Sequence, residues 1–180
     1  GDAWMYYAGY MVMTTDYTTD MGYSTAAGDP TKLSNMTYDA NNRYFKYNWQ
    51  CMYQVISNAN VLLQNIDNIS MDETKKKQVI AQAKFLRALA YRDLTDGWGP
   101  VPLITELIDP STAKNMPLTS VEDVNNFMIA DLKECIENLP EEWTGQDLAR
   151  ATKGAAATLL GKIYLRSHDY TNAKTYIDMV

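Results

Sequence analysis

The side chains best suited to hold a ligand gather in the first third of the sequence. Nine of the 13 tyrosines lie within residues 1–53. A sugar is held by flat aromatic faces that cover its C–H groups and by amide, carboxylate or guanidinium groups that pair with its hydroxyls. Residues 17–44 offer that mixture. Our candidate ligand-binding residues are Tyr17, Tyr23, Tyr38, Asn41, Asn42, Arg43 and Tyr44.

The alternative interpretation of these tyrosines is structural, because tyrosine often covers a helical core.

Two further polar residues, Asn60 and Arg87, stand among apolar neighbours. A charge or an amide that is buried must find partners, since an uncompensated one is costly in the interior. We therefore interpret Asn60 and Arg87 as structural hydrogen-bonding residues rather than as ligand contacts.

Catalysis finds little support in the residue types. His168 is the only histidine, and it falls in an expected turn. Glu141 and Glu142 are adjacent, and nothing marks them as the carboxylate pair that glycoside hydrolysis needs across a cleft. The sequence has no phosphate-binding glycine loop, no nucleophile elbow and no cluster of metal ligands. We expect a protein that is not an enzyme and has no cofactor or metal site.

The overall charge argues against nucleic acid as a partner. The 180 residues carry a formal net charge of −6, which gives no electrostatic reason to approach a phosphate backbone. The basic run Lys75–Lys77 is expected to be a solvated helix face. Cys51 and Cys135 lie in helical apolar patterns, so we expect small buried hydrophobes rather than a disulfide framework.

No stretch of the sequence is apolar enough over about 18–20 residues to span a bilayer, and no signal peptide opens it. The sequence starts with Gly-Asp and stops at Val180 within a helical pattern. We therefore expect it to be part of a longer protein, with any export signal or lipid anchor upstream of Gly1.

Apolar residues recur every three to four positions along most of the chain, which predicts an all-α fold of antiparallel helix pairs. We expect helices over residues 4–13, 44–66, about 73–96, 121–139, 155–166 and 170–180. Gly, Ser, Thr, Asn, Asp and Pro dominate residues 22–42, which predicts a long irregular loop. The second long helix should carry Val79, Ala83, Leu86 and Ala90 on one stripe.

Local signals predict where these helices begin and end. Ser70 and Glu73 match a capping box, and Ser120 and Thr152 are expected N-caps. Gly97 should terminate the helix that starts at this capping box, in the left-handed conformation, with Pro100 and Pro102 preventing its continuation.

A repeat underlies the later helices. Leu160, Gly161 and Tyr164 match part of the tetratricopeptide pattern, and Ala173 and Ile177 follow at the expected positions. Small residues allow two antiparallel helices to approach closely. Four residues recur at an offset of 73, which favours a short solenoid; the pairs are Ala83/Ala156, Leu86/Leu159, Ala88/Gly161 and Tyr91/Tyr164.

Several sequence motifs between about Trp49 and Val180 together resemble those of one family. In order, they are Trp49-x-x-x-Tyr53-x-x-Ile56-x-x-Ala59-Asn60, Ala83-Lys84-Phe85-Leu86-Arg87-Ala88-x-x-Tyr91, Trp98-Gly99-Pro100-Val101-Pro102-Leu103, Asp131-Leu132, Leu139-Pro140 and Arg150-Ala151-Thr152-x-x-Ala155-Ala156. Their order and spacing resemble the SusD/RagB family of outer-membrane nutrient-uptake lipoproteins.

The resemblance implies more than the residues show. Members of this family are anchored by lipid to the extracellular face of the outer membrane in Bacteroidetes-type bacteria. They cap a TonB-dependent (SusC-like) transporter and hand it oligosaccharides or other nutrients. The implied fold is SusD-like, with tetratricopeptide helices facing the transporter and less regular segments building the glycan site. A full-length member is much longer than this chain.

We therefore expect a single SusD-like helical domain fragment over residues 1–180. Its parts are an aromatic-rich segment and loop (1–43), a first helix pair (44–96), a connector (97–119), a second pair (120–167) and the start of a third (168–180). The alternative function is that of a tetratricopeptide adaptor, which binds a protein segment in its groove.

Overall fold

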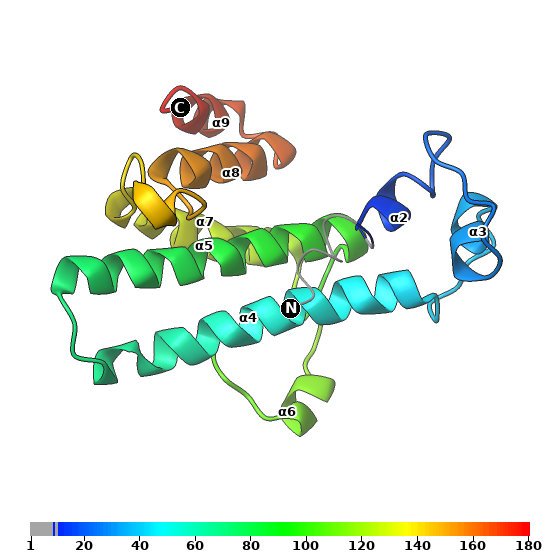
Figure 1. Ribbon diagram of the computed structural model, residues 1–180, viewed down its shortest axis with the longest axis horizontal. Helices are drawn as coiled ribbons and strands as arrows, with labels where there is room; N and C mark the ends of the chain where they lie inside the picture. Colours follow the sequence, from blue (N-terminus) through cyan, green and yellow to red (C-terminus); the bar gives the residue numbers. More distant parts are fainter. Residues whose placement is uncertain (1–8, 10) are drawn as a thin grey trace. The chain divides into compact units, whose positions relative to one another are not determined.

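The computed structural model describes residues 9 and 11–180, and it is built from helices (Figure 1). The longer α-helices are α4 (Arg43–Asn65), α5 (Glu73–Trp98), α7 (Val121–Asn138), α8 (Lys153–Arg166) and α9 (Tyr170–Ile177). Shorter ones are α2 (Met11–Thr15), α3 (Asp29–Ser34), α6 (Pro110–Lys114) and the 3₁₀ turns η2 (Ile66–Asn68) and η3 (Gly145–Asp147). The β-type pairing within this described part is an isolated antiparallel bridge between Val101 and Thr119. The all-α prediction is confirmed.

The chain divides into two compact units, Gly1–Gln54 and Val55–Val180. The first contains α2, α3 and the start of α4, and the second contains the rest of α4 and all later helices. The helix expected over residues 4–13 falls mostly outside the described residues. The expected irregular loop at 22–42 contains α3, because Pro30 presets a helical first turn after Gly28, whose φ is +90°.

In the second unit, consecutive helices pack as layers. Helix α5 packs on α7, α7 on α8, and α8 on α9 (Figure 1). The side chains that fill these interfaces are fully buried; they include Tyr91, Leu94, Val124, Met128, Leu132, Leu160 and Ile163. This order of packing is that of antiparallel helix pairs in a solenoid.

Helices α8 and α9 approach each other closely at Gly161. A Cβ placed on this glycine would lie 2.6 Å from Ile177 Cγ1 and 3.4 Å from the Ala173 carbonyl oxygen. Ala173 is itself buried. The small residues of the tetratricopeptide pattern therefore lie at the seam between α8 and α9.

Two predicted N-caps are confirmed and one is wrong. The Ser120 hydroxyl accepts from the Asp123 N–H at the start of α7, and the Thr152 hydroxyl accepts from the Ala155 N–H at the start of α8. Helix α5 is capped by Asp72, whose carboxylate accepts from the Lys75 N–H at 2.9 Å, and not by Ser70. Both residues can cap, but a carboxylate at a helix N-terminus also gains from the helix dipole.

The predicted end of α5 is also displaced. The helix runs through Gly97 to Trp98, and Gly99 takes the positive φ of 73° that ends it. Leu86, expected on the buried stripe, is 50% exposed. It lies at the edge of a groove described below.

Neither cysteine belongs to a cluster of metal ligands among the described residues. Cys135 is buried and its thiol donates to the Ala81 carbonyl, as expected of a small core residue; burial raises the pKa of this thiol to about 12. Cys51 is only half-buried. Over residues 9 and 11–180, we find no helix with the length and apolar character that crossing a membrane requires.

Candidate functional site

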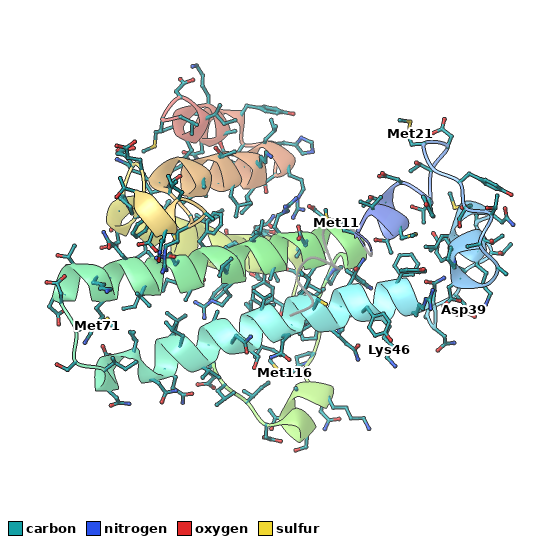
Figure 2. All side chains as sticks on the ribbon, in the orientation of Figure 1. Met11, Met21, Asp39, Lys46, Met71 and Met116 are labelled. Atoms are coloured by element: carbon teal, nitrogen blue, oxygen red, sulfur yellow. The ribbon has the colours of Figure 1, made fainter. Side chains whose placement is uncertain are left out.

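The aromatic segment before α4 is an ordered structure tied together by its own polar groups. Ser34 Oγ accepts from the Ser24 N–H at 3.0 Å, and Ser24 Oγ accepts from the Ala26 N–H at 3.2 Å. Leu33 is fully buried beneath this turn. In Figure 2, Met21 lies on the loop before α3 and Asp39 on the turn between α3 and α4. The first unit therefore presents its candidates on a hydrogen-bonded frame.

Asn42 starts helix α4. Its side-chain oxygen accepts from the Tyr44 N–H at 3.1 Å, and its amide group donates to the Asp29 carbonyl at 3.3 Å. The side chain is buried. These contacts are those of a helix N-cap that also joins α3 to α4.

Asp29 and Arg43 form the charged part of this junction. The Asp29 carboxylate accepts from the Arg43 N–H at 3.3 Å and lies 3.9 Å from Arg43 Nε. The guanidinium donates to the Tyr44 hydroxyl at 2.9 Å and lies over the Tyr44 ring. Tyr44 is only 6% exposed, so most of its ring faces the protein and Arg43 covers part of the remainder.

The other candidates are more accessible. Tyr23 is 69% exposed and Tyr38 is 39% exposed. The Tyr38 ring lies 5.0 Å from that of Phe45, tilted by 51°, which holds it in one orientation. Asn41 is exposed, and its backbone N–H is bound by Asp39. Tyr23, Tyr38, Asn41 and Arg43 thus keep side-chain surface that a ligand can reach.

Tyr17 has a close backbone neighbour. A Cβ on Gly22 would lie 2.5 Å from Tyr17 Cδ1 and 2.9 Å from the Asp16 carbonyl group. The loop after α2 therefore folds back onto the Tyr17 ring, which leaves that ring half-buried.

The structure adds two residues that the sequence did not indicate. Asp29 is the carboxylate paired with Arg43, and Phe45 is the aromatic partner of Tyr38. The order Gly28-Asp29-Pro30 is a helix-start signal that could have placed Asp29 beside the start of α3. Its contact with Arg43 depends on the chain turn between α3 and α4.

A separate groove of about 340 Å³ lies in the second unit, between α4 and α5. Both helices line it with an aliphatic–small–aliphatic pattern at i, i+4 and i+7. The apolar lining residues on α4 are Val55, Ala59 and Leu62, and those on α5 are Val79, Ala83 and Leu86; Asn58, Gln82 and Arg150 add polar groups to the lining. This surface fits an apolar segment better than a sugar, since it offers aliphatic side chains rather than aromatic faces.

Asn60 and Arg87 lie in the same unit and are buried at 1% and 5% exposure. Arg87 binds Asp131 through two hydrogen bonds of 2.9 and 3.0 Å. Burial raises the pKa of the Asp131 carboxyl, and the Arg87 guanidinium acts in the opposite direction. Both residues are engaged inside the protein.

The residues considered for catalysis are dispersed. His168 is exposed in the α8–α9 turn with a φ of +61°, and its Nδ1 lies 3.1 Å from the Tyr170 hydroxyl. Glu141 forms an ion pair with Lys153. In the described residues, no group of three or more His, Cys, Asp or Glu side chains could hold a metal ion.

This architecture defines a class of protein, in which a helical-repeat scaffold carries an aromatic and polar loop. A family model described as "Starch-binding associating with outer membrane" matches residues 5–165. The chain belongs to this SusD-like family, as the motifs predicted.

Similar proteins support the assignment. A SusD-like protein of Bacteroides ovatus is 35% identical over 133 residues, which cover 71% of this chain and 23% of that protein. A solved laminarin-binding SusD-like protein has a TM-score of 0.82 at 29% identity, covering 95% of this chain and 41% of that one. Another structure, determined with xylogluco-oligosaccharide, has a TM-score of 0.78 at 28% identity, covering 97% and 36%. The chain spans about a quarter of the length of the curated relatives it matches.

Proposed function

We propose that this chain is part of a non-catalytic protein that binds an oligosaccharide or polysaccharide at the cell surface. Family membership carries the proposal, since solved relatives of similar fold are named for laminarin binding or were determined with a xylogluco-oligosaccharide. The exposed aromatic and polar side chains of the first unit support it, because that mixture suits sugar C–H faces and hydroxyls.

Within that unit we assign ligand contact to Tyr23, Tyr38, Asn41 and Arg43, which are exposed. Asp29 would fix the Arg43 guanidinium, and Phe45 would fix the Tyr38 ring. Asn42, Tyr44 and Tyr17 belong to the supporting frame. The assignment keeps four of the seven candidates selected from the sequence, namely those whose side chains are exposed.

The proposal extends to location and partner. We infer that the protein is held on the extracellular face of the outer membrane by a lipid anchor upstream of this chain. It delivers its glycan to a TonB-dependent, SusC-like transporter. The family description, which names association with the outer membrane, supports the location. Co-purification with an outer-membrane barrel from native membranes would test the partner.

Isothermal titration against a panel of neutral polysaccharides tests glycan binding. We expect micromolar to millimolar affinity for at least one glycan. Tyr38→Ala should weaken it about 3- to 10-fold, since an aromatic face contributes about 0.5–1.5 kcal/mol beyond its buried area.

Tyr170→Ala is the control, because Tyr170 is also an exposed tyrosine, at 62% against 39% for Tyr38, but lies at the start of α9. It should leave the affinity unchanged. Equal losses from both variants, or no binding across the panel, would contradict the assignment. Release of reducing sugar by the purified protein would contradict the proposal that the protein is not an enzyme.

The apolar groove between α4 and α5 favours a second candidate function, that of an adaptor for a protein segment. Its half-exposed Leu86 is the observation in favour. Recovery of a soluble protein partner that is lost with Leu86→Asp, together with no glycan binding, would favour this alternative.

A further inference from the structure

The connector between α5 and α7 is held at two places: its two ends are bound to each other, and its backbone is bound to the helices further along. At its base, the Thr119 N–H donates to the Val101 carbonyl at 3.0 Å, and Val101 is fully buried. The second attachment lies at residues 104–106. Here the backbone is bound by side chains from two different helices, rather than by other backbone groups.

Three side chains make this second attachment. The Tyr91 hydroxyl donates to the Ile104 carbonyl at 2.9 Å and accepts from the Ile104 N–H at 2.7 Å. The Asn60 amide donates to the carbonyls of Ile104 (3.0 Å) and Glu106 (3.2 Å). Arg87 Nη1 donates to the Thr105 carbonyl at 3.3 Å. Each carbonyl from 104 to 106 therefore has a side-chain donor.

Arg87 sets the orientation of Asn60. Its Nη1 donates to Asn60 Oδ1 at 2.6 Å, so the amide oxygen must face the guanidinium and the NH₂ must face the connector. Asp131 holds the other edge of the guanidinium through two hydrogen bonds, and the Phe127 ring lies 4.7 Å from its centre. Arg87 is thus fixed by α7 and acts on the connector directly and through Asn60.

These attachments lie away from the apolar groove. Asn60 follows the groove residue Ala59, and Arg87 follows the groove residue Leu86, each by about 100° around its helix. Asn60 and Arg87 are absent from the groove lining. The connector is therefore bound by other faces of α4 and α5 than those that line the groove.

Beyond residue 106 the attachments stop. Hydrogen bonds within residues 107–118, such as those of Asp109 with Ser111 and Thr112, are local to α6. Among the described residues, no hydrogen bond or ion pair joins 107–118 to the long helices. Leu107 is 50% exposed and Leu118 is 66% exposed. Figure 2 places Met116 on this projecting part of the loop.

We propose that Arg87, Asn60 and Tyr91, with Asp131 holding Arg87 in place, form a buried polar clamp that divides the connector into a fixed arm, residues 101–106, and a tip, residues 107–118, that moves independently. Arg87 is the positioning residue of this clamp. The tip can change conformation when a partner or ligand contacts it, while the clamp keeps that change from reaching α5 and α7.

The two parts carry cleavage sites for different proteases, which makes the division measurable in one protein. Glu106 lies at the end of the arm, and Lys114 lies in the tip. With the 180-residue chain, we expect trypsin to cleave after Lys114 at least about tenfold faster than Glu-C cleaves after Glu106, each rate normalised to an unfolded peptide of the same sequence. Fragments are identified by mass spectrometry.

Variants then separate the clamp from general stability. Arg87→Lys keeps the charge but loses the planar fork, so cleavage after Glu106 should rise about tenfold while cleavage after Lys114 stays constant. If this variant does not fold, the double variant Arg87→Met/Asp131→Leu removes both buried charges without leaving either unpaired, and the same rise is expected.

Cys135→Ala is the matched control. It alters the same α5–α7 interface through the bond to Ala81, and among the described residues Cys135 forms no hydrogen bond with the connector. In this variant, the ratio of the normalised cleavage rate after Glu106 to that after Lys114 should equal the wild-type ratio. Similar normalised rates at the two sites in the wild type would overturn the proposal. So would an unchanged ratio in the clamp variants, or an equal rise in Cys135→Ala.

Discussion

At the scale of single residues, the candidates divide by burial into an exposed group and a supporting group. Asn42 caps α4 and Tyr44 is covered by Arg43, whereas Tyr23 and Tyr38 expose much of their rings. The sequence predicted the segment and the residue types. It could not separate these roles, because exposure depends on the turn that brings Asp29 to Arg43.

Tyr91 has a phenol whose pKa is shifted by its surroundings. Burial raises the pKa of Tyr91 to about 12, although the hydrogen bond with Ile104 and the charge of Arg87 act in the opposite direction. An unfolded tyrosine ionises near pH 10. The folded protein therefore keeps the proton after the unfolded chain has released it.

This difference predicts a loss of stability at high pH. The Tyr91 contribution is fully present below about pH 10 and should fall by about 2–3 kcal/mol as the pH rises to 12. Urea unfolding at pH 8, 10 and 11.5 measures it. Tyr91→Phe should lose about 1 kcal/mol at pH 8, because its hydrogen bonds to Ile104 are gone. An equally steep alkaline decline in Tyr91→Phe would contradict the assignment.

At the scale of elements, periodicity predicted the long helices well. The observed bounds of α4, α5, α7 and α8 lie close to the expected ones, since long amphipathic patterns are strong local signals. Ends were less predictable: Asp72 displaced Ser70 as a cap, and Gly99 displaced Gly97. Neighbouring residues with similar propensities compete at such positions, and the surrounding fold selects between them.

Elements held by distant contacts could not be predicted. The short α3 depends on the backbone of Gly28, and the connector depends on Asn60, which is 44 residues from Ile104. A local pattern contains no information about such a pairing. The need of Asn60 and Arg87 for partners was foreseeable, but the identity of those partners was not.

The seam between α8 and α9 gives a direct test of the repeat pattern. Gly161→Ala should destabilise the protein by about 1–2 kcal/mol, because the new Cβ clashes with Ile177 Cγ1. The free-energy cost of this clash exceeds the gain in helix propensity from alanine. Chemical unfolding measures the change. Adding Ile177→Ala should recover at least about 1 kcal/mol in a double-mutant cycle.

Gly154→Ala is the control for this test, since it lies in the same helix and its Cβ would have no neighbour nearer than 3.9 Å. It should be neutral or stabilising by up to about 1 kcal/mol. A stabilising Gly161→Ala would mean that the two helices are not closely packed there.

At the scale of the whole molecule, the chain combines a helical-repeat unit with an aromatic unit and belongs to the SusD-like family. The repeat unit has a well-packed core, and the aromatic unit carries the exposed rings of Tyr23 and Tyr38. The chain corresponds to about a quarter of its curated relatives. We propose that it supplies part of a glycan surface, and further parts of a longer protein would complete that surface.

Tyrosine-ring NMR tests this account most directly, because the 13 tyrosines report on both units at once. Rings labelled with ¹³C would be followed while the best-binding glycan of the panel is added. We predict that the signals of Tyr23 and Tyr38 shift with the glycan concentration, while those of the buried Tyr91 and Tyr164 do not. Shifts confined to the tyrosines of α5, α8 and α9 would contradict the account.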